Sequence, residues 1–426
     1  MVILRYSFHI SMKAISDLKS YERTIKMDTF AAQRLSRDID LSTVRKLKLN
    51  RLSSEDAELL SKLTILEYLS VNEVAEKIPN VPSLKTLKIG TLRTIDGIQE
   101  LHNLEYLKLT GSSIKDIGLL SGLTSLKRLN FDFTDIEDIG VLSTLTKLES
   151  LSLVQTKVVD LSPLKACRSL CWFIFELRDR LSANKIDITP LGKCTSLKQL
   201  ILTYTPVIGF DSIGRCTSLE SLFLNGLIVR RKELVALSSL HNMRELILTS
   251  VLTVDSIQFV EEMPNLLILD ISDTNVTDIS PITCLKEIVY LTMNNLCDIE
   301  DYSPLSSLTS LVYLRMRMSS LSSLVYIKDL PLVKLDIRYT LVRDISVLRE
   351  MKTLSTLYLH GMTYTKEELT SVMHVKNIFK TPGLQIQIAD EPRPVYLYLQ
   401  KRFIDGTTLQ KSIDDELERV ATLNER

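Results

Sequence analysis

A leucine motif that recurs about every 22 residues constrains the fold of this chain more than any other feature of its sequence. The pattern Leu-x-x-Leu-x-Leu occurs at residues 104–109, 126–131 (with Phe in the last position) and 148–153. Following its middle leucine from Leu47 to Leu357 gives about 15 turns, mostly 20 to 24 residues apart. One repeat cannot bury its apolar edge alone, so this period predicts that neighbouring repeats stack on one another.

The second half of each repeat has a signature of its own. Ile-Lys-Asp-Ile at 114–117 and Val-Thr-Asp-Ile at 276–279 recur in phase, and several repeats continue with Ser/Thr-Pro-Leu/Ile. Alternating leucines predict a short strand with one buried face, while Asp and Pro favour the start of a brief helical turn. The pattern therefore predicts an α/β leucine-rich-repeat solenoid, in which a curved parallel sheet is joined by short helical or 3-10 return segments. The recurrent Asp residues are interpreted as turn positions rather than a calcium ladder.

The loop position after each strand often holds Ser or Thr, for example Ser112, Thr134 and Thr274. A hydroxyl can hydrogen-bond the neighbouring backbone but offers fewer donors than an amide. We therefore expect a somewhat less regular hydrogen-bond ladder along that edge.

Composition excludes several classes of function. Among 426 residues, 52 Lys and Arg balance 52 Asp and Glu, so no global charge attracts nucleic acid or an anionic membrane. No run of apolar residues is long enough to cross a bilayer. Residues 1–10 lack the basic start of a signal peptide, so we interpret them as structure and expect an intracellular, cytoplasmic protein.

The repeat consensus carries a family resemblance. Leu-Thr-Ser-Leu-x-x-Leu-x-Leu-x-x-Thr-x-Ile-x-Asp-Ile-Ser-Pro-Leu, over residues 43–360, resembles the 22-residue repeats of bacterial internalins. It is also similar to the repeats of the phosphatase regulatory subunit of the same class, and Cys-Thr-Ser-Leu at 194–197 and 216–219 resembles protozoan repeat proteins. The resemblance implies the fold but does not identify a partner. Internalins carry a secretion signal and a surface anchor, and the lack of both patterns here argues against an adhesin role.

Three regions are expected along the chain: an N-terminal helical cap (1–42), the solenoid (43–362), and a C-terminal cap with a helical tail (363–426). Within the last region, residues 365–373 predict a Thr-capped helix and 384–388 a final edge strand. The tail at 406–424 is interpreted as a solvated cap helix in preference to a partner-docking helix. One step is 27 residues long, so 176–184 contains an insertion, which either structural drift or an interaction rim explains.

Signals for catalysis, metals and cofactors are missing. None of the five His has metal-ligand spacing, and there is no Gly-rich phosphate loop or nucleophile elbow. We therefore expect a protein that is not an enzyme and binds no cofactor. Cys167, Cys194 and Cys216 occupy one slot in three successive repeats. We expect them to be buried, reduced and unligated substitutes for Leu, in preference to a metal ladder.

Residues that alternate with the buried leucines should face the concave surface of the sheet. They divide into a polar and partly basic first zone, a middle zone of apolar residues at positions that should face water, and a last zone rich in Tyr and Arg. Trp, Tyr and Arg dominate interface energetics, and contiguous apolar patches mark interaction sites. The predicted partner-binding residues are Trp172, Ile174, Ile201, Phe223, Ile247, Tyr290, Tyr313, Arg315 and Tyr358.

The favoured function is a non-catalytic scaffold that binds a protein partner on this concave face. One alternative is single-stranded RNA binding, with Tyr or Trp stacking on bases and a basic stripe contacting phosphates. That stripe consists of Lys46, Lys48, Lys85, Lys88, Lys108, Lys127 and Arg128. A further alternative is that the protein is a structural subunit of a large assembly. The apolar zone would not be a binding site if a cap or loop covered it. The oligomeric state stays open.

Overall fold

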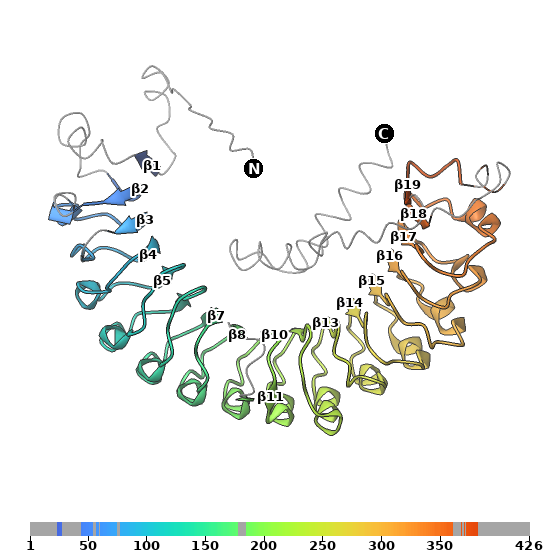
Figure 1. Cartoon of the computed structure of the whole chain (residues 1–426), viewed down its shortest axis with the longest axis horizontal. Helices are drawn as coiled ribbons and strands as arrows, with labels where there is room; N and C mark the ends of the chain where they lie inside the picture. The colour runs from blue at the N-terminus through green and yellow to red at the C-terminus, as the bar shows by residue number, and fades with distance from the viewer. Residues whose placement is uncertain are drawn as a thin grey trace, which may run out of the picture. The chain divides into compact units, whose positions relative to one another are not determined.

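A computed structural model describes residues 24–27, 44–53, 57–58, 60–74, 77–177, 185–360, 368, 370 and 372–381. The chain divides into two compact units, residues 1–381 and 382–426, and the second lies outside the described residues. Within the first unit, 17 strands pair in parallel into one sheet. The strands line the inner side of an arc and the return segments lie on its outer side (Figure 1).

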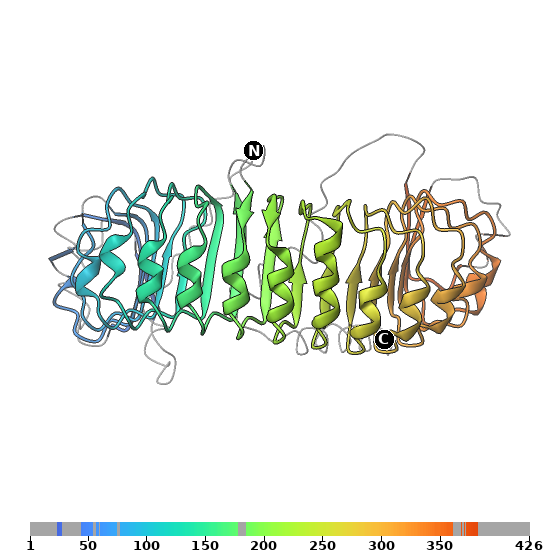
Figure 2. The same ribbon diagram turned by 90° about the horizontal axis from the view of Figure 1, so that it is seen from below.

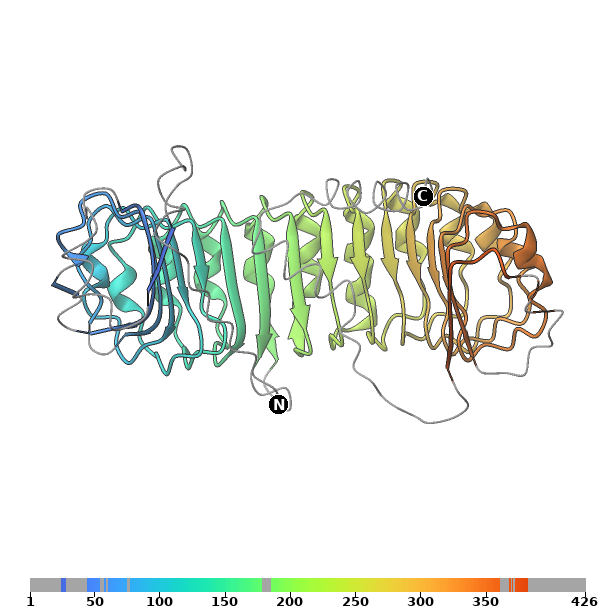
Figure 3. The same ribbon diagram turned by 90° about the horizontal axis from the view of Figure 1, so that it is seen from above.

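The strands follow chain order across the sheet, each paired with the next, and they lie side by side in Figure 3. They are β1 (Thr24–Met27), β2 (Lys46–Leu52), β3 (Tyr68–Val74), β4 (Thr86–Thr91), β5 (Tyr106–Leu109), β6 (Arg128–Asn130), β7 (Ser150–Thr156), β8 (Trp172–Leu177), β10 (Gln199–Thr203), β12 (Ser221–Phe223), β13 (Glu245–Ile247), β14 (Ile268–Asp270), β15 (Tyr290–Thr292), β16 (Tyr313–Arg315), β17 (Lys334–Asp336), β18 (Thr356–His360) and β19 (Asn377–Thr381). A separate two-stranded sheet joins β9 (Ile186–Asp187) to β11 (Val207–Ile208).

Short 3-10 helices form the return side, where Figure 2 shows them stacked next to one another. They are η3 (Ile98–Glu100), η4 (Gly118–Leu120), η5 (Gly140–Thr144), η6 (Ser162–Ala166), η7 (Thr189–Lys193), η8 (Phe210–Arg215), η9 (Arg231–Ser239), η10 (Gln258–Glu262), η11 (Ser280–Cys284), η12 (Ser303–Ser307), η13 (Val325–Ile327) and η14 (Ser346–Glu350). Proline occupies the first or second position of η6, η7, η11 and η12, where its missing N–H costs nothing.

The recurrent leucines form the core, as predicted. The motif leucines stack in register from strand to strand, for example Leu107 on Leu129 and Leu129 on Leu151. All six leucines chosen from the sequence are at most 1% exposed: Leu107, Leu129, Leu151, Leu200, Leu222 and Leu357. The 15 predicted turns correspond to the strands from β2 to β18 that belong to the large sheet.

The recurrent aspartates have a structural role at the turns. A side-chain oxygen of Asp116 accepts a hydrogen bond from the Gly118 backbone N–H at 2.7 Å, and Asp160 does the same for Ser162 at 2.8 Å. Asp138, Asp187, Asp278, Asp301 and Asp344 repeat this contact. Each contact satisfies an N–H at the start of a 3-10 helix that has no partner inside the helix. This geometry confirms the interpretation of these residues as turn positions.

The loops after several strands share a second structural feature. The Thr134 hydroxyl donates to the carbonyl of Phe131 at 2.6 Å, and the Thr274 hydroxyl to that of Ile271 at 2.7 Å. One residue earlier, the backbone is left-handed even where the residue is not glycine, as at Phe133 with φ 60°. Where this residue is not glycine, the repeat therefore turns at a strained position that local hydrogen bonds hold in place.

The ends extend the sheet. Within the expected helical cap at 1–42, the described residues Thr24–Met27 form a strand, because the unpaired edge of β2 offers its backbone groups to them. At the other end, β19 pairs with β18 within the region expected as a cap. In the predicted helix at 365–373, the described Glu368 and Thr370 are helical. The predicted strand at 384–388, the tail helix at 406–424 and residues 178–184 of the insertion lie outside the described residues.

Candidate functional site on the concave face

The residues that alternate with the core leucines form continuous rows across the sheet. In each strand, one residue lies between the two leucines of the Leu-x-Leu motif. We call the set of these residues across the sheet the central row. The pairing register aligns this row from β2 to β18 without a break. It reads Lys48, Ser70, Lys88, Lys108, Asn130, Ser152, Ile174, Ile201, Phe223, Ile247, Asp270, Thr292, Arg315, Asp336 and Tyr358. A second row, two residues earlier in each strand, adds Tyr68, Tyr106, Trp172, Tyr290 and Tyr313.

A set of cations and tyrosines occupies the first five repeats, and we call it the basic ladder. The Lys88 ammonium lies over two rings, 5.5 Å from the centroid of Tyr68 and 5.2 Å from that of Tyr106. The Lys48 ammonium lies 6.0 Å from the Tyr68 centroid, and the Arg128 guanidinium lies 4.9 Å from the Tyr106 centroid. The members are Lys48, Tyr68, Lys88, Tyr106, Lys108 and Arg128.

The basic ladder carries uncompensated positive charge. Burial lowers the pKa of the Lys88 ammonium, and the nearby charges of Lys108, Lys48 and Arg128 lower it further. Among the described residues, none of these four cations forms an ion pair with a carboxylate. The neighbouring Asp132 carboxylate instead accepts hydrogen bonds from side chains of Asn130 and Ser152.

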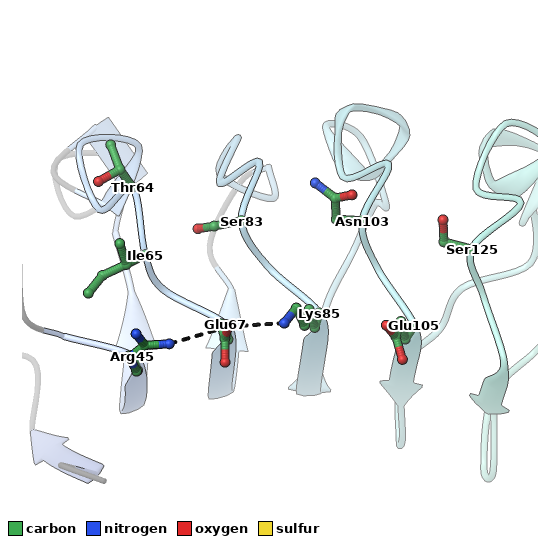
Figure 4. Close-up of a pocket in the computed structure, with 9 residues that line it drawn as sticks. All are labelled: Arg45, Thr64, Ile65, Glu67, Ser83, Lys85, Asn103, Glu105 and Ser125. Atoms are coloured by element: carbon green, nitrogen blue, oxygen red, sulfur yellow. Dashed lines mark hydrogen bonds and ion pairs between the residues drawn. The ribbon is translucent and has the colours of Figure 1, made fainter.

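A row of paired charges runs beside the ladder, at the position immediately before each strand, and we call it the paired rim. Glu67 lies between Arg45 at 3.6 Å and Lys85 at 3.0 Å (Figure 4). Glu105 pairs with Lys127 at 3.1 Å. The hydrogen bond and the charge of Lys85 lower the pKa of the Glu67 carboxyl. This rim lines a shallow groove of about 420 Å³. Its charges satisfy one another, which leaves little for a ligand.

Six of the seven residues of the predicted basic stripe therefore divide into two rows that the sequence did not separate, and Lys46 belongs to neither. Lys85 and Lys127 belong to the paired rim, whereas Lys48, Lys88, Lys108 and Arg128 belong to the basic ladder. Glu67 and Glu105, which interrupt the stripe in sequence, lie in the rim alone.

The apolar middle zone is in register but more buried than its sequence position indicated. Trp172 is 40% exposed and Ile174 is half-buried, but Ile201, Phe223 and Ile247 are 8%, 4% and 6% exposed. Polar neighbours on the same face are buried to the same degree, among them Ser152, Ser221 and Glu245. Low exposure is therefore a property of this part of the face rather than of its apolar side chains. The expectation that all these apolar residues face water is wrong for three of them.

A hydrogen-bonded carboxylate borders this zone. The Glu176 side chain, 5% exposed, accepts hydrogen bonds from Gln155 at 2.7 Å and from Thr203 at 2.9 Å. These contacts join three neighbouring strands, β7, β8 and β10, at the side where the chain leaves the sheet.

The last zone combines stacked aromatic rings with arginines. Tyr290 stacks on Tyr313 with centroids 5.3 Å apart, and burial raises the pKa of the Tyr290 hydroxyl. Asp336 is fully buried and receives two hydrogen bonds from the Arg338 guanidinium, at 2.9 and 2.7 Å. Arg315 lies 3.8 Å from the same carboxylate.

Tyr358 marks the end of this zone, where it stacks on Phe379 at 4.7 Å. Sequence reasoning missed Phe379 because β19 follows the last full repeat, although the alternation of Asn-Ile-Phe-Lys-Thr at 377–381 was a usable signal.

The predicted site residues thus form two groups on one face. Trp172, Ile174, Ile201, Phe223 and Ile247 span β8 to β13, while Tyr290, Tyr313, Arg315 and Tyr358 span β15 to β18. Strand β14, with Asp270 in the central row, separates them.

The cysteine slot behaves as expected from a buried leucine position. Cys167, Cys194 and Cys216 are fully buried, which confirms that part of the prediction. All six cysteines of the chain are free, and within the described ranges no three His, Cys, Asp or Glu side chains gather as metal ligands. Burial raises the pKa of the Cys167 and Cys216 thiols to about 11 and that of Cys194 to about 12.

Comparisons with solved structures support the same class of protein. An internalin from Listeria monocytogenes is 28% identical, with a TM-score of 0.61 over 68% of this chain and 84% of that one. A leucine-rich repeat protein from Leptospira interrogans is 17% identical, with a TM-score of 0.62 over 84% and 99% of the two chains. A plant receptor kinase ectodomain from Arabidopsis thaliana, solved in complex with Casparian strip integrity factor 2, is 15% identical, with a TM-score of 0.55 over 79% and 46%.

No family profile and no curated protein matches the sequence. The fold and these structures define the class: the chain is a leucine-rich repeat protein that resembles internalins. In the part of the chain that the structure describes, no helix has the length and apolar character needed to cross a membrane.

Proposed function

We propose that this scaffold binds a protein partner on its concave face. The observation that carries the proposal is Trp172, the only Trp of the chain, which is 40% exposed at the centre of the inner face. A large aromatic side chain left in water on a repeat surface contributes nothing to the core, whereas Trp is prominent among interface hot spots. Ile174, two residues later on β8, adds a half-buried apolar neighbour.

The other site residues have different parts in this proposal. Ile201, Phe223 and Ile247 continue the row of Ile174 as a buried floor and keep the contact surface rigid. Tyr290, Tyr313, Arg315 and Tyr358 form a second contact area further along the same face. Their stacked rings and the ion pairs around Asp336 hold them in fixed positions before a partner arrives, which lowers the entropic cost of binding.

We also propose an intracellular, cytoplasmic location. The observation that supports it is chemical: all six cysteines are free, and three of them occupy the hydrophobic core. Free thiols persist in a reducing compartment, whereas secreted proteins more often oxidise theirs.

Capture of partners from an extract, followed by mass spectrometry, tests the proposal with the tagged full chain. The matched variants are Trp172→Ala, on the proposed contact, and Leu119→Ala, an apolar residue 40% exposed on η4 at the return side. We expect Trp172→Ala to lose the captured protein, with a cost on the order of 2 kcal/mol in binding, and Leu119→Ala to retain it. Equal capture by both variants would contradict the proposal.

A further inference from the structure

We propose that the basic ladder on β2 to β6 binds an extended acidic segment of a partner protein, whose carboxylates contact Lys48, Lys88, Lys108 and Arg128. The proposal rests on the proposed function in one respect, namely that the ligand of the concave face is a protein. It concerns different residues from the Trp172 contact and a different chemistry.

The spacing of the ladder fits an extended peptide that crosses the strands. Neighbouring strands lie about 4.8 Å apart, so the distance from β2 to β6 is about 19 Å. An extended chain rises about 3.3 Å per residue, so about six residues cover this distance. Side chains on one face of such a peptide recur about every 6.6 Å. Lys48 and Lys88 are two strand spacings apart, which is longer than this side-chain repeat. Lys88 and Lys108 are one strand spacing apart, which is shorter. The flexible Lys side chains accommodate the difference.

The charge distribution favours an anion at this place. Every described carboxylate in the paired rim already has a cation, while the four ladder cations have only tyrosine rings and one another. Lys88 lies at the centre, with its ammonium held between two rings and close to three other positive charges. A carboxylate that enters there relieves repulsion that the free protein carries. All four cations are at least partly exposed, so a ligand can reach them.

The tyrosines argue for a protein segment rather than single-stranded RNA. RNA recognition of this kind stacks bases on open aromatic faces. Here Lys48 and Lys88 lie over the Tyr68 ring, and Lys88 and Arg128 lie over the Tyr106 ring. The rings are thus engaged in fixing the cations. The ladder offers positive charge at defined points but little stacking surface, which suits carboxylates on an extended chain.

Fluorescence anisotropy with labelled probes tests this directly on the full chain. The probes are a peptide of about eight residues that alternates Glu and Ser, its Lys-Ser counterpart, and an oligouridine of matched charge. We expect the Glu-Ser peptide to bind, with an affinity that falls as salt rises through about 0.1 M, and the Lys-Ser peptide not to bind. Binding of oligouridine as tight as that of the Glu-Ser peptide would overturn the assignment to a protein segment.

Charge-reversal variants locate the binding. Lys88→Glu should lower the affinity for the Glu-Ser peptide by at least about tenfold, because it replaces the central attraction by repulsion. The new carboxylate can pair with Lys48 or Lys108, so we expect the variant to fold, and thermal melting verifies this. Lys147→Glu is the matched control, because Lys147 is exposed outside the ladder and forms no ion pair with a described residue. If both charge reversals lowered the affinity equally, the peptide would be attracted by the net charge of the protein rather than by the ladder, and the proposed site would be refuted.

Trp172→Ala separates the two proposals. It should bind the Glu-Ser peptide as the wild type does, while it loses the partner captured from an extract. If no acidic peptide binds but capture still depends on Trp172, the ladder proposal fails and the proposed function stands. If the peptide binds at the ladder but capture is indifferent to Trp172, the ladder proposal stands and the Trp172 contact fails.

Discussion

Phe223→Ala should destabilise the fold appreciably, although Phe223 points away from the leucine core. The side chain is 4% exposed and lies in register between Ile201 and Ile247 on neighbouring strands. Truncation loses the transfer free energy of a buried aromatic side chain, about 1.5–3 kcal/mol. The further cost of a closed cavity, which brings core Phe→Ala substitutions to about 3–5 kcal/mol, applies only in part on a sheet face. We therefore expect a loss of about 2–3 kcal/mol in the free energy of unfolding.

Denaturant unfolding followed by circular dichroism measures this loss, with Leu222→Ala and Trp172→Ala as comparisons. Leu222 is fully buried in the core, so its truncation should cost more, about 3–5 kcal/mol. Trp172 is 40% exposed, so its truncation should cost less than about 1 kcal/mol. Unchanged stability of Phe223→Ala would show that the central row is solvated and that the burial argument fails. A loss equal to that of Leu222→Ala would show that the row belongs to the core.

Three further outcomes follow from particular contacts. At pH 8 a thiol reagent should label the exposed Cys297 in the native protein, while the core thiols, whose pKa burial raises to about 11 or 12, react only after unfolding, as counted by mass spectrometry. Met318→Gly should raise stability by about 1 kcal/mol in a thermal melt, because Met318 is exposed and has φ 54°. Asp336→Asn should cost about 3–5 kcal/mol in denaturant unfolding, because it leaves the buried Arg338 guanidinium without its counter-charge; a loss below about 1 kcal/mol would contradict this.

The repeat itself was predictable because the sequence period and the burial of the motif residues have the same cause, the stacking of neighbouring repeats. The residue at each middle motif position, leucine in every strand except for Phe173 in β8, must stack on its counterpart in the next repeat. Counting these positions from Leu47 to Leu357 therefore counts strands. The same reasoning identifies the central row, because residues on either side of a buried position in a strand face the other way. Asp116 and its equivalents were predictable for a similar reason, since a turn once per repeat needs a side-chain acceptor once per repeat.

The ends and the state of the concave face were not predictable by this reasoning. Thr24–Met27 carries no repeat motif, and it is a strand because β2 offers an unpaired edge, which is a tertiary cause. The burial of Phe223 depends on neighbours on the same face, which alternation within one strand does not reveal. The separation of Lys85 from Lys88 into a paired and an unpaired row depends on which carboxylates lie within reach, and sequence order alone mixes the two.

The last prediction concerns the effect of salt on the stability of the fold, which follows from the charges of the basic ladder. Two unit charges 5–10 Å apart in water repel by about 0.4–0.8 kcal/mol, and salt of about 0.1 M screens beyond about 10 Å. Lys88 repels Lys48, Lys108 and Arg128, while its contacts with two tyrosine rings oppose this repulsion. Salt weakens the repulsion more than it weakens ring contacts at short range. Stability of the wild type should therefore rise with salt relative to Lys88→Met, which keeps the stem but removes the charge.

The pH dependence has the same origin. Burial and the neighbouring cations lower the pKa of Lys88, so its charged form is disfavoured in the folded state. The resulting penalty is present at every pH below the folded pKa and fades as pH rises through that pKa towards the ordinary value of Lys. Denaturant unfolding at several salt concentrations, below and near that range, measures both effects, with Lys147→Met as the exposed control. If Lys88→Met and Lys147→Met show the same dependence on salt, the ladder cations do not repel one another, and the argument for an anionic ligand loses its electrostatic basis.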